Sequence, residues 1–331
     1  MPIPRLVPGD FTTRAELARL VGGSLQGGIV PIVDTKMVLV FSDPQAGAEH
    51  GYTFDGRAED DERGPLYLYT GAGATGDQAL TGVNGSLLRH AEMGREVHLF
   101  VADGYVGKSK TVRQRYVGQV VVDPEQSYEE CWSTSNSVEP RRLYVFRLRP
   151  AATGELALTD RDLLQPAPAT TVLEVPTSSE PRIGTPGATA VPVERHGTDQ
   201  TTANLPGGSV AIVRREGQLV TAFQQVLAEA GHTFHRHQIT VAGEPGSLMT
   251  DLYDDTDNVL YEAKGKSRRI DVRMAIGQLR DYRRHLNTPP GLRLAVLLPG
   301  DPGEDLRDFL AAENIALVTQ SDDGFEGFPV Q

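Results

Sequence analysis

A stretch rich in proline, threonine, alanine and glycine, residues 151–208, divides this chain into two parts with different hydrophobic rhythms. Such a composition supplies little apolar surface for a core and is typical of a linker. The length of 331 residues exceeds one ordinary domain, and a hydrophobic content of 39% is enough for two cores. The sequence therefore predicts a first domain over residues 1–150, a linker over 151–208 and a second domain over 209–331.

Composition also limits the cellular setting. The sequence contains no run of eighteen apolar residues, so we expect no membrane span. Its beginning lacks the pattern of a secretory signal, and the single cysteine, Cys131, has no partner for an internal disulfide. These features predict a protein of the reducing cytoplasm that does not associate with membranes.

The formal charge of −12 opposes the binding of nucleic acid, which is itself a polyanion. Basic residues nevertheless gather in two short runs. The simpler explanation of each run is a solvated surface, but a local basic patch can bind phosphates on an acidic protein in a salt-sensitive way. The runs contain Lys108, Lys110, Arg113 and Arg115, and Lys264, Lys266, Arg268, Arg269 and Arg273.

The first domain shows the short apolar runs of a β-rich fold, separated by glycine and proline. One amphipathic helix is predicted over residues 13–21, with Thr12 or Thr13 as its N-cap. We expect a curved or barrel-like mixed sheet. The predicted strands are residues 37–41, 66–69, 97–101, 116–122 and 143–148.

The second domain alternates helical and strand-like patterns, in the order α-β-β-β-α-β-α-β. This order predicts an α/β domain of about 120 residues. The predicted helices are residues 215–230, 271–286 and 305–314, and the predicted strands are residues 234–242, 248–253, 258–264, 292–298 and 315–319.

Chemically useful side chains lie on the second and third of these strands. Glu262 and Lys264 are two residues apart and therefore share one face of a strand. A tight connection from the preceding strand would bring Asp251 beside Glu262. Two carboxylates can hold Mg²⁺, and a nearby lysine can orient or deprotonate a water molecule, which together suit phosphodiester hydrolysis. A cross-strand Glu–Lys pair on a solvated face would explain the pattern equally well.

Taken with the surrounding elements, residues 214–319 resemble the PD-(D/E)XK nuclease superfamily. The resemblance implies that Asp251 and Glu262 bind Mg²⁺, for which Mn²⁺ could substitute, and that Lys264 assists the attacking water. It also implies roles for Glu216 on the first helix and Gln278 on the second. The sequence departs from the motif in one respect. The motif has a proline immediately before the aspartate, and this chain has Thr250 there.

The first domain supports a second resemblance. The motifs Gly51-Tyr-Thr-Phe-Asp55, Leu68-Tyr-Thr-Gly-Ala-Gly73 and Gly76-Asp-Gln-Ala-Leu-Thr81, followed by Asn84, resemble the SRA domain, which is PUA-like. The resemblance covers residues 47–149 and is greatest to modification-dependent, type IV-like restriction endonucleases of bacteria. The resemblance implies a domain with a curved β-barrel, which binds DNA and takes a flipped modified cytosine into a pocket. It also implies a location in the bacterial cytoplasm.

Physical chemistry assigns roles within such a pocket. Tyr52 and Tyr69 could stack on a flipped base, and Asp55 could accept a hydrogen bond from the cytosine amino group. Thr70 and Gly71 would form the wall beside the 5-substituent. Lys108, Lys110, Arg113 and Arg115 would form a loop that grips phosphates. The simpler explanations are core packing for the two tyrosines and a turn for Asp55.

Two further patterns are weaker. His232, His235 and His237 offer imidazole ligands, but no second pair has zinc-finger spacing, so we do not expect a metal there. The glycine-rich segment Gly71-Ala-Gly-Ala-Thr-Gly76 is not embedded in a βαβ unit and is not expected to bind a dinucleotide.

The sequence thus predicts a homodimeric endonuclease that recognises double-stranded DNA carrying 5-methylcytosine or 5-hydroxymethylcytosine and cuts nearby with Mg²⁺. The backbone contacts of the second domain would come from Lys266, Arg268 and Arg269. Two alternatives remain open at this point: a catalytically silent reader of modified DNA, and a repair or recombination nuclease that does not depend on modification.

Overall fold

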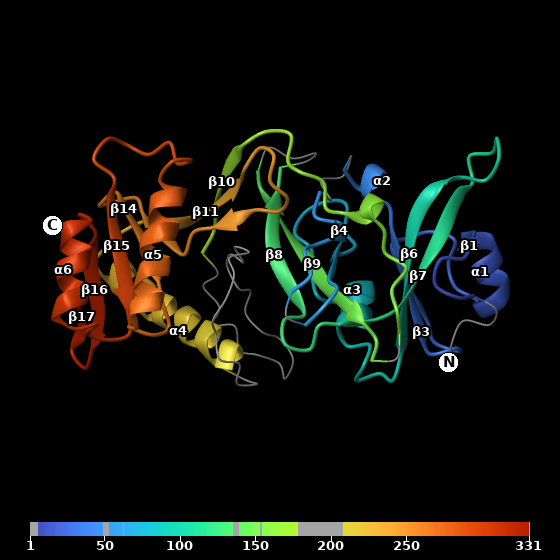
Figure 1. Cartoon of the computed structure of the whole chain (residues 1–331), viewed down its shortest axis with the longest axis horizontal. Helices are drawn as coiled ribbons and strands as arrows, with labels where there is room; N and C mark the ends of the chain where they lie inside the picture. The colour runs from blue at the N-terminus through green and yellow to red at the C-terminus, as the bar shows by residue number, and fades with distance from the viewer. Residues whose placement is uncertain are drawn as a thin grey trace. The chain divides into compact units, whose positions relative to one another are not determined.

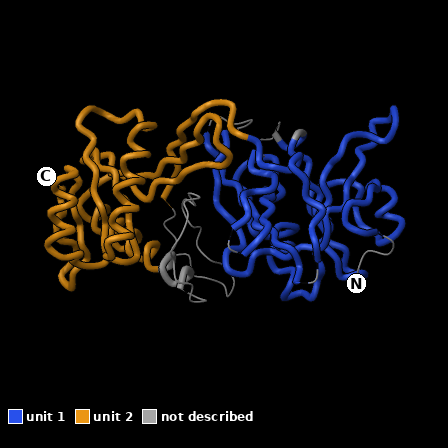
Figure 2. Tube along the Cα trace, viewed as in Figure 1, with its two compact units in different colours: residues 1–165 blue, residues 166–331 orange. Residues whose placement is uncertain are grey.

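The computed structural model describes residues 6–48, 53–61, 63–134, 139–152, 154–177 and 208–330 (Figure 1). The chain forms two compact units, residues 1–165 and 166–331 (Figure 2). Within these described ranges, no helix is both long enough and apolar enough to cross a bilayer.

The first unit is built on a nine-stranded sheet with the order β2-β3-β6-β7-β9-β5-β4, to which β1 and β8 add at β7 and β9. Its strands are β1 (Phe11–Thr12), β2 (Ile29–Ile32), β3 (Met37–Ser42), β4 (Gly56–Arg57), β5 (Tyr67–Thr70), β6 (Glu96–Tyr105), β7 (Val112–Val122), β8 (Tyr128–Ser133) and β9 (Arg141–Pro150). Its helices are α1 (Arg14–Val21), α2 (Pro44–Ala48), α3 (Gly82–Leu88) and the short 3₁₀ helix η1 (Asp160–Asp162).

Local sequence explains where α1 begins. Thr13 has an extended backbone and forms a reciprocal capping box with Glu16, so the predicted N-cap is confirmed. All five predicted strands of this unit are present. The described strands do not close into a barrel, because the path ends at β2 and β4 without a pairing between them.

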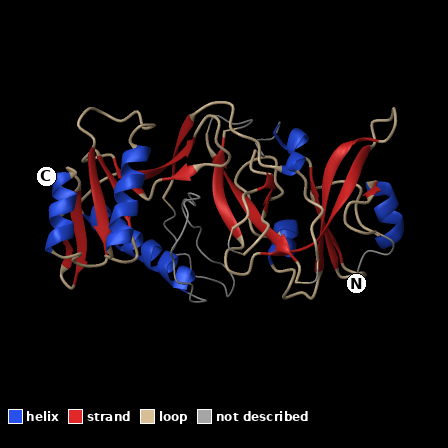
Figure 3. Ribbon diagram, in the orientation of Figure 1, coloured by secondary structure: helices blue, strands red, loops and turns tan. Residues whose placement is uncertain are grey.

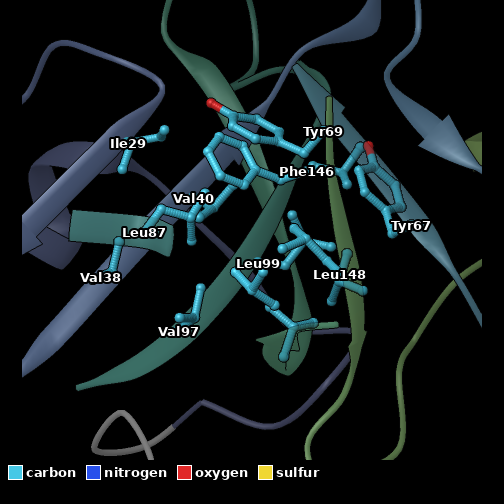
Figure 4. Packing of buried hydrophobic residues seen from close by; sticks show 14 residues of the cluster. Ile29, Val38, Val40, Tyr67, Tyr69, Leu87, Val97, Leu99, Phe146 and Leu148 are labelled. Atoms are coloured by element: carbon cyan, nitrogen blue, oxygen red, sulfur yellow. The ribbon is translucent and has the colours of Figure 1, made fainter. Parts of the chain in front are cut away.

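One buried cluster of the first unit lies on the face of the sheet that α3 covers, and a second, which includes Leu17 and Val21 of α1, contains the alternate residues of β3 and β6. Leu87 of α3 packs with valines and leucines from β3, β6, β7 and β9, and two tyrosines of β5 border the same cluster (Figure 4). Burial of this apolar surface is the main favourable contribution to the folding of the unit.

The second unit contains an eight-stranded sheet with the order β10-β11-β13-β14-β15-β16-β17, and β12 adds at β11. Strands β14, β15 and β16 are parallel, whereas β13 runs antiparallel to β14. The strands are β10 (Thr171–Val175), β11 (Phe234–Thr240), β12 (Leu248–Met249), β13 (Leu252–Asp254), β14 (Val259–Ala263), β15 (Arg293–Leu298), β16 (Ala316–Ser321) and β17 (Gly324–Glu326). The helices are α4 (Gly208–Glu229), α5 (Arg269–Tyr282) and α6 (Glu304–Ala312).

Helices cover both faces of the parallel strands (Figure 3). On one face, Phe223 of α4 packs against Tyr261 of β14. On the other face, α5 and α6 pack against Leu260 and the alternate residues of β15. Successive residues of β14 are therefore buried on opposite faces of the sheet. This alternation places Glu262 on the same face as Leu260.

The structure differs from the sequence prediction at the edges of this sheet. Residues 171–175 fall within the predicted linker, yet they form β10 and pair with β11. The predicted strand over residues 248–253 is split into β12 and β13 around Thr250 and Asp251. Edge pairing of this kind depends on long-range partners that local hydrophobic periodicity does not reveal.

Candidate functional site

Asp251 lies at the break between β12 and β13. Its Oδ2 atom accepts a hydrogen bond of 2.8 Å from the backbone N–H of Ala263, at the end of β14. The interruption of the strand lets the Asp251 carboxylate reach β14. A short connection between these strands was the basis for predicting this approach. The hydrogen bond fixes the position of Asp251 beside the end of β14.

Glu262 and Lys264 occupy the same end of β14. The Lys264 ammonium lies 2.6 Å from Glu262 Oε1, and the two residues are only 6% and 1% exposed. The Lys264 backbone N–H donates to Leu297 of β15 and extends the parallel pairing. A buried ion pair is expensive to desolvate, so it is weak evidence for a purely stabilising role.

Glu216 joins this pair from α4. Its Oε1 atom accepts a hydrogen bond of 3.0 Å from the backbone N–H of Gly265. Burial opposes the charge on Lys264, but Glu262, Asp251 and Glu216 together raise the pKa of the ammonium above its usual value. Burial also raises the pKa of Glu216, while Lys264 acts in the opposite direction. The structure thus brings together the predicted residues Glu216, Asp251, Glu262 and Lys264, which we call the acidic cluster.

The acidic cluster suits a divalent cation in its chemistry. Three carboxylates and one ammonium leave a formal excess of two negative charges. Their donors are oxygens, which Mg²⁺ and Mn²⁺ prefer. Asp251 and Glu262, which the resemblance names as metal ligands, both lie at this end of β14.

Gln278 is positioned differently. It is buried in α5, and its amide donates to the Tyr282 hydroxyl at 3.3 Å. Within the described part of this unit it makes no hydrogen bond to the acidic cluster. Its predicted part in catalysis remains a prediction.

The basic residues that follow Lys264 lead into α5. Lys266 is half-buried, and Arg268 and Arg269 are exposed. Arg268 pairs with Asp271, and Arg269 pairs with Asp305. The Arg269–Asp305 pair is exposed on both sides and therefore weak, so this guanidinium group can exchange its partner for phosphate.

In the first unit, Asp55 is buried at the centre of a polar network. Its carboxylate accepts from the Thr70 backbone N–H at 2.6 Å and from the Ser42 hydroxyl at 3.0 Å. The Tyr67 hydroxyl in turn donates to Ser42. Burial raises the pKa of Asp55 to about 6, against the opposing effect of the hydrogen bonds. Each carboxylate oxygen has two lone pairs, so the network leaves some capacity to accept from a ligand.

The remaining predicted pocket residues are divided between the core and the polar network. Tyr69 is 4% exposed and packs with Phe146 in the core (Figure 4). Thr70 is buried, and the surroundings of Gly71 are tight, because an added Cβ would lie 3.0 Å from side-chain oxygens of Asn84 and Gln78. Tyr52 lies outside the described residues.

The basic segment between β6 and β7 is only partly the predicted phosphate-binding loop. Lys108 and Lys110 are exposed in the connection between the strands, whereas Arg113 and Arg115 lie on β7. The structure gives Arg115 a buried setting, and its predicted phosphate contact stays a prediction. Its guanidinium is buried in ion pairs with Asp103 and Asp162, so its donors are already engaged within the unit.

Two neighbours of the predicted pocket were not identified from the sequence. Ser42 links Asp55 to Tyr67, and its only local signal was its place at the end of an apolar run. Arg14 of α1 lies 4.0 Å above the centre of the Phe41 ring and interacts electrostatically with Tyr69. Tertiary packing brings Arg14 there, and no motif marks it.

Comparison with known proteins identifies the first unit. Residues 8–157 match the family model described as "ScoMcrA-like, SRA domain". The chain therefore carries an SRA domain. This result confirms the resemblance found in the sequence for the first domain. No curated protein matches the chain.

Several solved structures are similar to part of the chain. The sulfur binding and SRA domains of ScoMcrA with phosphorothioated DNA share 25% identity over 46% of this chain, with a TM-score of 0.33. The type IV phosphorothioation-dependent restriction endonuclease ScoMcrA shares the same identity over the same 46% of this chain, with the same TM-score. The SUVH5 SRA domain with fully methylated CG DNA shares 20% identity over 47% of this chain and 96% of its own, with a TM-score of 0.32. The chain spans only 41% and 27% of the two ScoMcrA structures.

The raised pKa of Asp55 predicts a pH dependence of stability. The folded state binds this proton more tightly than the unfolded state, whose pKa is near 3.8. The contribution of protonated Asp55 to the free energy of unfolding is therefore complete below about pH 4 and is lost as the pH rises through about 6. Its upper limit is about 3 kcal/mol. Urea unfolding followed by the fluorescence of Trp132, the only tryptophan, reports on this unit. The loss of stability between pH 4 and 6 should be smaller in Asp55→Asn, and an identical pH profile would contradict the assignment.

The burial of Arg115 predicts a structural role. Arg115→Ala leaves the buried carboxylate of Asp162 without its guanidinium partner and should lower the free energy of unfolding by about 3–5 kcal/mol. Arg113→Ala removes a more exposed partner of Asp103 and should cost less than about 1 kcal/mol. Trp132 fluorescence during urea unfolding measures both changes. Normal stability of Arg115→Ala combined with weakened DNA binding would restore the phosphate-binding role.

Proposed function

We propose that this protein is a Mg²⁺-dependent endonuclease whose SRA domain directs it to DNA that carries a modified cytosine. The observation that supports catalysis best is the acidic cluster, in which Glu262 pairs with the buried ammonium of Lys264 and Asp251 and Glu216 act on it electrostatically. The proposal for recognition rests on the SRA family match over residues 8–157.

The surrounding fold agrees with the PD-(D/E)XK resemblance. Asp251 immediately precedes β13, which is the antiparallel neighbour of β14, the strand of Glu262, and helices cover both faces of the sheet. The helix that precedes these strands contributes Glu216, as the resemblance implies. This agreement supports a nuclease over a fold that only carries a chance Glu–Lys pair.

Each residue of the acidic cluster has a distinct task in phosphodiester hydrolysis. Asp251 and Glu262 would hold the Mg²⁺ ion, with Glu216 beside them. When bound, the ion stabilises negative charge on the phosphate and makes water more acidic. Lys264, whose pKa is raised, donates hydrogen bonds as a cation and orients the water or a phosphate oxygen. Lys266, Arg268 and Arg269 extend positive charge from this point along the start of α5.

In the SRA domain, Asp55 is the residue best placed to recognise cytosine. Its buried carboxylate is held by Ser42 and Thr70, so an amino group that enters the pocket meets an oriented acceptor. Tyr69 and Tyr52 are proposed to contact the flipped base. Lys108 and Lys110 are exposed and available for the backbone phosphates. Cutting both strands requires two acidic clusters, so we propose that the protein acts as a homodimer.

Catalysis can be separated from binding by two substitutions. Lys264→Ala and Glu262→Gln should lower the rate of plasmid cleavage by about 100-fold or more, since each removes a group that acts on the transition state. DNA affinity, measured by fluorescence anisotropy, should remain close to that of the wild type. The matched variant Lys266→Ala should weaken DNA binding but still cut at saturating DNA.

The cleavage assay is run with Mg²⁺ or EDTA on plasmids with unmodified, 5-methylated or 5-hydroxymethylated cytosine. We expect cleavage only with the metal and only of modified DNA. Equal cleavage of unmodified DNA would favour a nuclease that does not depend on modification. Tight binding without cleavage of any substrate would favour a silent reader.

Recognition is tested at Asp55. Asp55→Asn keeps the size of the side chain but replaces one acceptor oxygen with a donor. The preference for modified over unmodified duplexes should fall by about 1–3 kcal/mol, or roughly 5–150-fold in relative affinity. Asp34→Asn makes the same charge change at an exposed turn and should leave the preference unchanged. An unaltered preference in Asp55→Asn would place the base pocket elsewhere.

A further inference from the structure

The strand pair β10–β11 brings two histidines and a glutamate together in the second unit. His235 and His237 are two residues apart on β11, so they share one face of the strand, and their Nε2 atoms are 3.1 Å apart. Glu174 of β10 is the cross-strand partner of His237. One ligand atom from each of the three residues lies within 4.8 Å of the others.

We propose that Glu174, His235 and His237 bind a divalent transition-metal ion, with Zn²⁺ as the ion that the ligand set suits. Two imidazole nitrogens that bind one tetrahedral Zn²⁺ at about 2.0–2.1 Å lie about 3.4 Å apart. The observed separation is therefore close to that of a formed site. Two nitrogens and one carboxylate oxygen favour Zn²⁺ over Mg²⁺, which prefers oxygen ligands. This site is separate from the acidic cluster and does not depend on the proposed nuclease activity.

Neighbouring residues prepare the two imidazoles to act as ligands. The Nδ1 atom of His235 lies 2.8 Å from Asp255 Oδ2. A carboxylate at this position holds the proton on Nδ1 and leaves the Nε2 lone pair directed toward His237, as in many metal sites. The ring of Tyr253 packs edge-on against both histidines and limits their rotation.

His237 is the most buried of the three ligands. Glu174 is exposed and can approach the ion by a change of rotamer. With a third ligand from β10, the ion would tie this edge strand to β11.

The site also borders the backbone that presents Asp251. The His237 N–H donates to Thr250 Oγ1 at 2.8 Å, and the Thr250 N–H donates to the His237 carbonyl oxygen at 3.0 Å. Thr250 immediately precedes Asp251. An ion bound at His237 would therefore stiffen the segment on which the acidic cluster depends.

Direct metal binding tests the proposal on the full chain. Metal-free protein in the Glu262→Gln background, which weakens binding at the acidic cluster, is titrated with Zn²⁺ in competition with a chromophoric indicator. We expect one equivalent of Zn²⁺ to bind, and a large excess of Mg²⁺ should not displace it. Co²⁺ at the same site should give the visible absorption of a four- or five-coordinate complex.

Substitutions assign the ligands. Asp255→Asn should weaken Zn²⁺ binding by about 10–100-fold, and His235→Ala and Glu174→Gln should weaken it at least as much. The controls Glu244→Gln, an exposed carboxylate after β11, and His232→Ala, a histidine outside the trio, should leave it unchanged. Circular dichroism checks that each variant is folded, and Glu174→Gln changes only an exposed side chain. Absence of Zn²⁺ binding, or undiminished binding in both Glu174→Gln and His235→Ala, would overturn the proposal.

Discussion

The electrostatic interaction of three carboxylates with one buried ammonium is the interaction on which the proposed function of the second unit depends. Lys264 cannot be placed among apolar residues at acceptable cost without neighbouring negative charge. Glu262, Asp251 and Glu216 supply more negative charge than Lys264 neutralises, and the remaining excess is what a divalent ion would balance. The same arrangement keeps Lys264 protonated, which favours a role in orienting water or phosphate over one in accepting a proton.

The fold brings these residues together from separate elements. Residues of β14 bury alternately against α4 and α5, so the direction of Glu262 is set by two cores at once. The break between β12 and β13 frees Asp251 to bond to the end of β14. Packing of Phe223 against Tyr261 holds α4 where Glu216 can reach Gly265. Stability and the proposed catalysis are thus coupled, because loosening either helix would disperse the acidic cluster.

Local patterns in the sequence predicted most of this arrangement. Period-two spacing placed Glu262 and Lys264 on one face, and the short connection to the preceding strand predicted the approach of Asp251. Partners set by long-range packing were not predictable in this way. Strand β10, with Glu174, was assigned to a linker because its pairing with β11 has no local signal. Arg115 was assigned to phosphate binding because the sequence does not reveal its partners. Asp103 lies on the neighbouring strand, and Asp162 is far away along the chain.

The central claim is that Asp251 and Glu262 jointly hold a divalent ion beside Lys264, and anomalous diffraction from crystals containing Mn²⁺ tests it most directly. The account predicts a peak within coordination distance of one oxygen from each of these two carboxylates. A peak that touches neither residue, or no peak there at saturating Mn²⁺, would contradict it.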